Sequence, residues 1–296
     1  MNLRDWIVKY YTVYRAMELK LSTIRSYLSY LPNVPSDWEL ETITAEDLQL
    51  LINNLARRLS ASSVKHTYSI ISEPIKNAPR FGFCDRSDIF MYIKLPKLHK
   101  KIVHSLSDAE LDKLLPFIFT SAYADVYLTL LNMGMRFCEL SGLNTSDFSE
   151  SDMVVKIQQR FYRGELENGS KTTAGVRVLP IPTSLQEIFL KHSSGKSSEK
   201  PIFLSVNGFR MSYNTILHNW HKICDSAGVR RCGIHTLRHT FATKLLDAGA
   251  SLKVVSAFLG HKSIAITADI YCDVPMSAKR NAIALYEFAQ TKNHSE

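Results

Sequence analysis

The sequence predicts a mainly α-helical protein with one small β-sheet, divided into two domains. Apolar residues recur at spacings of three and four along most of the chain, as in helices with one buried face. Only residues 153–159 and 176–181 have the pattern of β-strands, and they flank a polar hairpin. The chain has 296 residues, whereas single hydrophobic cores stop growing at about 250–300 residues. We therefore expect two domains.

Residues 1–93 predict a bundle of four short helices. Their buried faces are expected to carry Trp6 and Ile7, Ile24 and Leu28, Leu48 and Ile52, and Val64 and Ile71. Pro32 is expected to end the second helix, and Pro74 to kink or end the fourth. Thr44 and Asp47 have the spacing of a capping box, which predicts the start of the third helix.

Residues 94–106 predict a linker, because lysines surround Pro96 and favour an extended, basic segment. A second domain, residues 107–296, is expected to follow it. Ser107 and Glu110 form a predicted capping box at its first helix, and Thr183 is expected to cap a later one in the same way.

The composition is that of an ordinary globular protein, with 45% hydrophobic and 22% charged residues. No apolar run approaches the ~20 residues of a membrane helix, and the first residues lack the apolar core of a signal peptide. Five scattered cysteines favour reduced thiols over a disulfide framework. We therefore expect a cytoplasmic protein. The net charge of +8 suits a nucleic acid partner, although it also serves solubility alone.

The densest group of chemically active residues lies between His235 and Tyr271. Two helical patterns fill this stretch, the first ending at Gly249 and the second at Gly260. His235, Arg238, His261 and Tyr271 are expected at helix ends and turns, where side chains can converge on one pocket.

This stretch resembles the C-terminal signature of the tyrosine recombinases, the phage integrase family. That signature has the form His-x-x-Arg, then Leu-Gly-His, then Tyr. Upstream, GMRFCEL resembles the first arginine box of the family, with Arg136 followed by Glu139. SKTTAGVRVLPI matches the lysine-bearing hairpin, with Lys171 in the place of the lysine. The boxes stand in the order of the family over residues 105–275.

The resemblance implies a compact, Xer-like site-specific recombinase that integrates, excises or resolves DNA, such as that of a mobile element. Residues 1–93 would be its core-binding domain and residues 107–296 its catalytic domain, together forming a C-shaped clamp on double-stranded DNA with a specific core site. Residues 276–296 would join four copies in the synapse, where accessory proteins are a further class of partner. The apolar face of this tail must be buried, and folding back on its own domain is the simpler alternative. No cofactor, metal or membrane is implied.

The chemistry of strand exchange explains the residue types. A tyrosine hydroxyl, here that of Tyr271, can attack the phosphate and hold it as a 3′-phosphotyrosine, so that a Holliday junction forms without ATP. The fixed cations Arg136 and Arg238 would stabilise the charge of the transition state. Lys171 would protonate the leaving 5′ oxygen, and His235 would accept the tyrosine proton. By the resemblance, His261 hydrogen-bonds the phosphate and Glu139 supports the site.

Phosphate contacts are expected from basic and hydroxyl groups outside the signature boxes, at helix starts and in the linker. The candidate DNA-binding residues are Lys20, Thr23, Arg25, Arg57, Arg58, Lys65, Lys97, Lys100 and Lys101.

Several alternatives remain open at this point. Arg136 and Glu139 also have the spacing of a surface ion pair. His235 and His239, with Cys232, also suit a metal site, although no second ligand pair follows at a finger-like spacing. Tyr286 is the nearest rival of Tyr271. A catalytically silent DNA-binding accessory protein and a type IB topoisomerase-like enzyme are the alternative functions; the full set of signature residues favours the recombinase.

Overall fold

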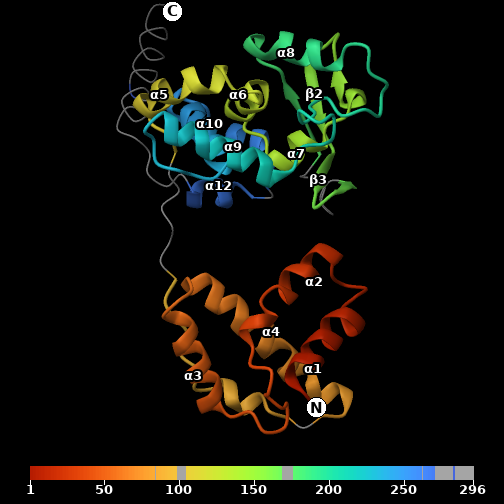
Figure 1. Ribbon diagram of the computed structural model, residues 1–296, viewed down its shortest axis with the longest axis vertical. Helices are drawn as coiled ribbons and strands as arrows, with labels where there is room; N and C mark the ends of the chain where they lie inside the picture. Colours follow the sequence, from red (N-terminus) through yellow and green to blue (C-terminus); the bar gives the residue numbers. More distant parts are fainter. Residues whose placement is uncertain (84, 99–104, 169–175, 262, 271–282, 284–296) are drawn as a thin grey trace, which may run out of the picture. The chain divides into compact units, whose positions relative to one another are not determined.

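The structure, a computed structural model, describes residues 1–83, 85–98, 105–168, 176–261, 263–270 and 283 (Figure 1). The chain forms two compact units, residues 1–101 and 102–296. Each unit has its own hydrophobic core. The division falls inside the segment 94–106 that the sequence predicts as a linker.

The first unit is a helical bundle. Its helices are α1 (Leu3–Lys9), α2 (Leu21–Leu28), α3 (Ala45–Ala56) and α4 (Ala61–Asn77), joined by a π-helical turn (Tyr10–Tyr14) and 3-10 turns (Leu31–Asn33, Ala78–Phe81, Ser87–Phe90). The long helix α4 packs against the other three (Figure 1). Trp6 is fully buried, and its indole donates a hydrogen bond of 3.0 Å to the carbonyl of Pro74. The four predicted helices are confirmed.

The structure corrects the positions of two helix ends that were predicted from proline. α2 already ends at Leu28, so Pro32 does not end it directly. Pro32 lies instead in the 3-10 turn Leu31–Asn33. α4 runs through Pro74 to Asn77, so the alternative that Pro74 ends this helix is wrong. Its burial and the bond from Trp6 offset the lost helical hydrogen bond, so tertiary packing outweighs the local preference.

Helix starts follow the predicted capping chemistry in two places and depart from it in a third. The side chains of Thr44 and Ser107 each cap a helix, and each is bound in return by the acid three residues later. Thr183 does not cap a helix. It is the first helical residue of α8, and Pro182 holds the cap position without a side-chain bond. The Thr183 side chain therefore lies one residue too far along the chain to act as the cap.

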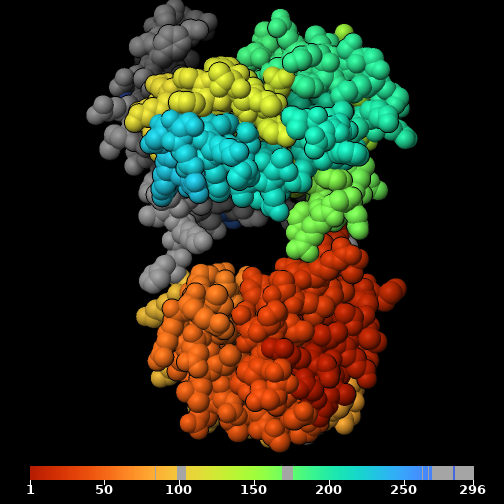
Figure 2. Space-filling model, in the orientation of Figure 1, coloured from red at the N-terminus to blue at the C-terminus, as the bar shows by residue number. Residues whose placement is uncertain are grey.

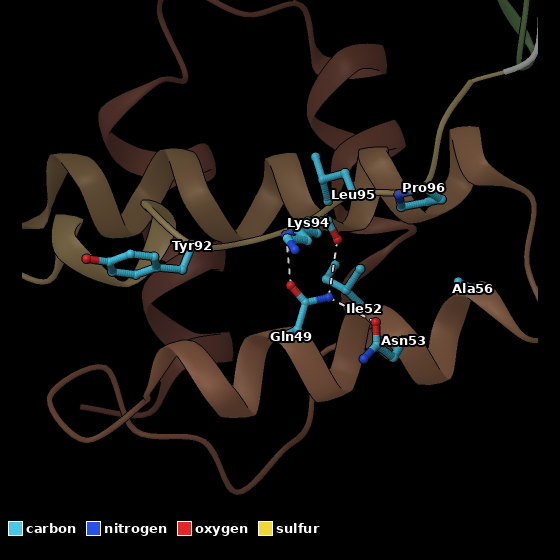
Figure 3. A pocket seen from close by; sticks show the side chains of 8 residues that line it. All are labelled: Gln49, Ile52, Asn53, Ala56, Tyr92, Lys94, Leu95 and Pro96. Carbon is cyan, nitrogen blue, oxygen red and sulfur yellow. Dashed lines mark hydrogen bonds between the residues drawn. The ribbon is translucent and has the colours of Figure 1, made fainter.

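Both ends of the predicted linker are fastened to folded units. A hollow in the first unit lies between α3 and the segment 92–96 (Figure 3). There, Lys94 donates its backbone N–H to Gln49 Oε1 at 2.8 Å, and Gln49 Nε2 donates to the Lys94 carbonyl at 3.2 Å (Figure 3). At the other end, the N–H of Leu106 donates to Thr240 Oγ1 at 2.9 Å in the second unit. Lys94 and Leu106 are therefore each hydrogen-bonded within a folded unit.

The second unit is helical, with small sheets on one side. Its helices are α5 (Asp108–Phe119), α6 (Ala124–Met133), α7 (Phe137–Gly142), α8 (Thr183–Ser193), α9 (Tyr213–Ser226), α10 (His235–Asp247), α11 (Leu252–Leu259) and α12 (Ile264–Ile270). α5 packs against α9, and α10 lies between α6 and α11. In the space-filling view, the cyan surface of α9 adjoins the yellow surface of α5 and α6 (Figure 2).

The described strands form a small sheet, as predicted for this mainly helical protein, and a separate two-stranded hairpin. β1 (Phe148–Ser149), β2 (Val154–Ile157) and β5 (Arg177–Pro180) form an antiparallel sheet in the order β1-β2-β5. β3 (Gln159–Tyr162) and β4 (Glu165–Asn168) form a separate hairpin. Residues 153–159 are thus split between two sheets. Gln158 and Gln159 bind Asp147 with their side chains, which diverts the chain between the strands.

None of the helices in the described part of the chain is long and apolar enough to cross a lipid bilayer. Cys138, Cys224 and Cys232 are free thiols.

Candidate functional site

The first arginine box lies where α6 ends and α7 begins. Gly134 ends α6 with φ +62°, and a Cβ there would lie 2.3 Å from the ring of Phe241, so only glycine fits. Arg136 precedes α7, and its backbone N–H donates to Glu139 Oε2 at 2.9 Å. Arg136 Nη1 donates to Glu139 Oε1 at 2.8 Å. The Glu139 side chain is only 11% exposed, so an ordinary surface ion pair does not describe this contact.

Three arginines from three elements surround this one buried carboxylate. Arg177, on β5, donates from Nη2 to Glu139 Oε2 at 2.8 Å and from Nη1 to Oε1 at 3.2 Å. Arg238, on α10, has Nη1 at 3.9 Å from Glu139 Oε2. We call Arg136, Glu139, Arg177 and Arg238 the Glu139 cluster. Burial would raise the pKa of Glu139, but bonds from Arg177 and the three positive charges lower the pKa to about 2.

Arg238 is buried and fixed by backbone carbonyl groups. Its side chain is 2% exposed. Nη1 donates to the carbonyl of Gly134 at 2.9 Å, and Nη2 donates to that of Leu259 at 2.6 Å. Both carbonyls stand at helix C-termini, the negative ends of helix dipoles, where a cation is favoured. Arg238 lies in the first turn of α10, consistent with the helix-end position expected for it.

The histidines of the signature lie close to these arginines. His235 opens α10, and its ring is perpendicular to that of His239 with centroids 4.6 Å apart. His261 follows α11, and its Nδ1 lies 2.8 Å from Thr267 Oγ1. The pKa of His235 and that of His261 are both lowered to about 4. Burial is the largest cause, and the charges of nearby arginines and of His239 add to it. Both imidazoles are therefore neutral near pH 7.

The alternative of a metal site gains no support from the geometry. The rings of His235 and His239 contact each other edge to face. Cys232 is hydrogen-bonded to Cys224, which lowers the pKa of the Cys232 thiol to about 6. Among the described residues, no group of three or more His, Cys, Asp or Glu side chains has the arrangement of a metal site.

Only some of the other predicted site residues lie within the part of the chain that the structure describes. Lys171, Tyr271, Lys100, Lys101 and most of the tail 276–296 lie outside the described residues. In the first unit, Arg25, Arg57, Arg58 and Lys97 are exposed, and Lys20, Thr23 and Lys65 are half-buried. α2, which carries Thr23 and Arg25, packs against α4, which carries Lys65. Their role in DNA binding stays a prediction.

Arg177 is the member of the cluster that sequence reasoning missed. It lies in the predicted strand 176–181, where alternation marks burial but does not say what a buried arginine would bind. Its signal was present, because Arg177 is the charged residue of an otherwise apolar VRVLPI segment. A charge in such a strand needs a buried partner.

The chain matches known proteins along most of its length. The family model described as the phage integrase family matches residues 100–277. The tyrosine recombinase XerC-like protein of Caldanaerobacter subterraneus subsp. tengcongensis is 29% identical over 208 residues, which are 61% of this chain and 53% of that relative. This match thus spans about half the length of that relative. A tyrosine recombinase of Pseudothermotoga lettingae is 28% identical over 267 residues, covering 88% of this chain and 87% of the relative.

Solved structures show the same fold. The integrase of transposon Tn1549, in complex with a circular intermediate DNA, has a TM-score of 0.78 at 18% identity and covers 97% of this chain and 99% of that chain. A lambda integrase tetramer bound to a Holliday junction has a TM-score of 0.69 at 18% identity, with 91% and 77% covered. Since the family model spans more than half of the chain, and the cluster joins its arginine and histidine boxes, the protein belongs to the phage integrase family and is a tyrosine recombinase of Xer-like type.

Proposed function

We propose that this recombinase cleaves DNA at a specific core site with Tyr271 and exchanges strands through a 3′-phosphotyrosine and a Holliday junction. Integration, excision and resolution are all carried out by this chemistry. The observation that supports the proposal best is the Glu139 cluster. Three guanidinium groups around one carboxylate leave an excess of two positive charges, beside two neutral histidines. A phosphodiester carries the complementary negative charge.

The two arginines of the signature have different tasks in this proposal. The Arg136 side chain is 37% exposed, so it is accessible to a phosphate that approaches from solvent. Arg238 is held by two carbonyl groups, so its charge is fixed before DNA arrives. Charges fixed in this way stabilise a transition state without reorganisation during the reaction.

His235 suits the role of proton acceptor because it is neutral. The depressed pKa, about 4, leaves the imidazole unprotonated across the physiological range. A phosphate bound beside Arg136 and Arg238 would oppose the arginine charges that lower this pKa. The pKa of His235 would then rise, which makes the imidazole a better base in the complex than in the free protein.

The direct test uses a nicked duplex that carries the site selected by the protein from a random-sequence pool. The nick releases a short fragment after cleavage, so the protein–DNA adduct accumulates. We expect the unchanged protein to form an adduct that survives denaturing electrophoresis. An adduct-free reaction with fully bound DNA would contradict the proposed function.

Lys171→Ala is expected to reduce cleavage of ordinary DNA and to be rescued by a substrate with sulfur at the 5′-bridging position. The reason is that a thiolate leaves without a proton, so the general acid is no longer needed. Single-turnover cleavage of both substrates measures this. Lys156→Ala, an exposed lysine on β2, is the matched control and should behave as the unchanged protein. A folded Lys171→Ala protein that sulfur does not rescue would remove Lys171 from this role.

We further propose that the first unit and the linker bind the DNA backbone and complete a clamp around the duplex. The basic residues of α2, the end of α3 and the start of α4 support this, since lysine and arginine supply most phosphate contacts. We place the protein in the cytoplasm, where reduced Cys138, Cys224 and Cys232 are stable. Four copies, and accessory proteins in some reactions, would assemble on paired sites.

Deleting residues 278–296 is expected to spare binding to a single site and to abolish assembly on two sites and strand exchange. The tail follows Tyr271 directly, and an apolar face passed from copy to copy closes a ring only when the last copy meets the first. Ile283 is 59% exposed, which suits a contact made outside its own unit. Band-shift and recombination assays measure the three properties, and Ile283→Glu tests the face at full length. A truncated protein that assembles on two sites and recombines them at the normal rate would show that the tail does not couple assembly to strand exchange.

A further inference from the structure

Arg177 connects parts of the second unit that are distant in sequence. Its side chain is 8% exposed. The Nε group donates to the carbonyl of Phe258, at the end of α11, at 2.7 Å. The two Nη groups donate to the two carboxylate oxygens of Glu139 on α7 at 3.2 and 2.8 Å. One guanidinium therefore joins β5 to both α7 and α11.

The fit of Arg177 against α11 depends on glycine. Gly260 has φ +63°, and a Cβ there would lie 2.8 Å from Arg177 Nη1. His261 follows directly, so the same backbone turn accommodates Arg177 and sets the position of His261. The glycine of the Leu-Gly-His motif thus has a packing reason as well as a conformational one.

The contact with Glu139 reaches the signature arginine indirectly. Glu139 Oε1 accepts hydrogen bonds from both Arg177 and Arg136. Burial acts to raise the pKa of Glu139, and the hydrogen bond from Arg177 is the largest contribution that lowers it. Without Arg177, the carboxyl would take up a proton more readily as the pH falls. A protonated carboxyl holds Arg136 less firmly, because its charge is lost.

We infer that Arg177 is a positioning residue for strand cleavage: it keeps Glu139 oriented and charged, and through Glu139 it fixes Arg136. This inference rests on the proposed function, because cleavage is its readout. A lysine would not serve as well, since a single ammonium does not match the two carboxylate oxygens and the Phe258 carbonyl together. Arg177 acts on the phosphate through its neighbours.

The test compares full-length Arg177→Gln with the unchanged protein on the nicked duplex described above, from pH 6 to pH 8. We expect cleavage by Arg177→Gln to be about 10²-fold slower at pH 8, as for a small misplacement of reacting groups. We also expect a further decline toward pH 6 that the unchanged protein lacks. The sign follows from Glu139: loss of the Arg177 hydrogen bond and charge raises its pKa, so protonation becomes more frequent as the pH falls, whereas a pKa of about 2 keeps the carboxylate charged in the unchanged protein.

Two controls separate positioning from general damage. Arg231→Gln removes another arginine that grips a carboxylate with two hydrogen bonds, to Asp225, on an exposed surface; it should leave the rate and the pH profile unchanged. Glu139→Gln removes the titrating carboxyl. Adding Arg177→Gln to it should slow cleavage no further and should not restore the added pH dependence. If the rate reduction of the double variant equalled the product of the reductions in the two single variants, Arg177 would act independently of Glu139.

Thermal unfolding shows whether Arg177→Gln folds. If it does not, Arg177→Lys, which keeps a positive charge, tests the positioning role instead. We expect it to fold and to cleave about tenfold more slowly than the unchanged protein, because the fork geometry is lost. Unchanged rates and pH profiles in the folded variants would overturn the role of Arg177, provided that the unchanged protein cleaves. If the unchanged protein itself forms no adduct, the proposed function fails.

Discussion

Tyr271→Phe is expected to bind the core site normally and to form no covalent adduct. The phenyl ring retains the shape of the tyrosine, but it lacks the oxygen that would attack the phosphate, so the first chemical step has no nucleophile. The loss should therefore be complete rather than partial. Band-shift assays measure binding, and denaturing electrophoresis of the nicked duplex measures the adduct.

Tyr286→Phe is the matched control for this experiment. Tyr286 is the nearest tyrosine that rivals Tyr271, and the same atom is removed. We expect it to form the adduct at the normal rate. If Tyr271→Phe still formed an adduct and Tyr286→Phe did not, the nucleophile would have to be assigned to the tail.

Arg238→Ala is expected to slow cleavage by about 10²–10³, the usual effect of removing one preorganised charge from a site of this kind. Arg136→Ala should fall in the same range. The arginines differ in their second effect, because Arg238 also binds the carbonyls of Gly134 and Leu259. Its removal leaves these two buried carbonyls without the hydrogen bonds from Arg238, and it takes one positive charge away from Glu139. The unfolding temperature should therefore also fall. Arg136 also binds Glu139, but its side chain is 37% exposed and it reaches a single carbonyl, that of Leu259. Its removal should therefore lower the unfolding temperature less.

Single-turnover cleavage and thermal unfolding separate these two effects. Arg238→Lys is the informative companion, since it keeps a charge while losing the planar fork. Normal cleavage by either alanine variant would exclude that arginine from the reaction. A slow reaction that was fully explained by unfolding at the assay temperature would assign Arg238 to stability alone.

Much of the fold could be predicted because it depends on local chemistry. The capping groups Thr44 and Ser107 and the glycines that end α10 and α11 act on their own helices, so a short window of sequence contains the whole interaction. The grouping of Arg136, Arg238 and His261 could also be predicted, because each stands in a motif that resembles a signature box of the phage integrase family. The structure brings them together around Glu139 and Leu259.

The features that were missed depend on contacts between distant segments. α4 continues through Pro74, which is buried and whose carbonyl accepts a hydrogen bond from Trp6, far away in the sequence. The strand predicted at 153–159 divides because Gln158 and Gln159 bind Asp147. Arg177 was overlooked for the same reason: its partners are Glu139 and Phe258, and nothing in its own strand indicates either of them. Periodicity shows that a residue is buried, but it does not show which partner it meets.

The wide sequence range of the Glu139 cluster has a consequence for the synthesis of the protein. Arg136 leaves the ribosome early, yet the carbonyl of Leu259, which binds both Arg136 and Arg238, emerges 123 residues after Arg136. Domains fold as units while the chain is made. Arg136 and Arg238, which we propose to bind phosphate, therefore cannot reach their final positions until α11 exists, and the predicted nucleophile at 271 emerges later still. Under the proposed function, a nascent chain would carry its basic surfaces well before its cleavage site is assembled, which would confine strand breakage to chains made at least as far as residue 271.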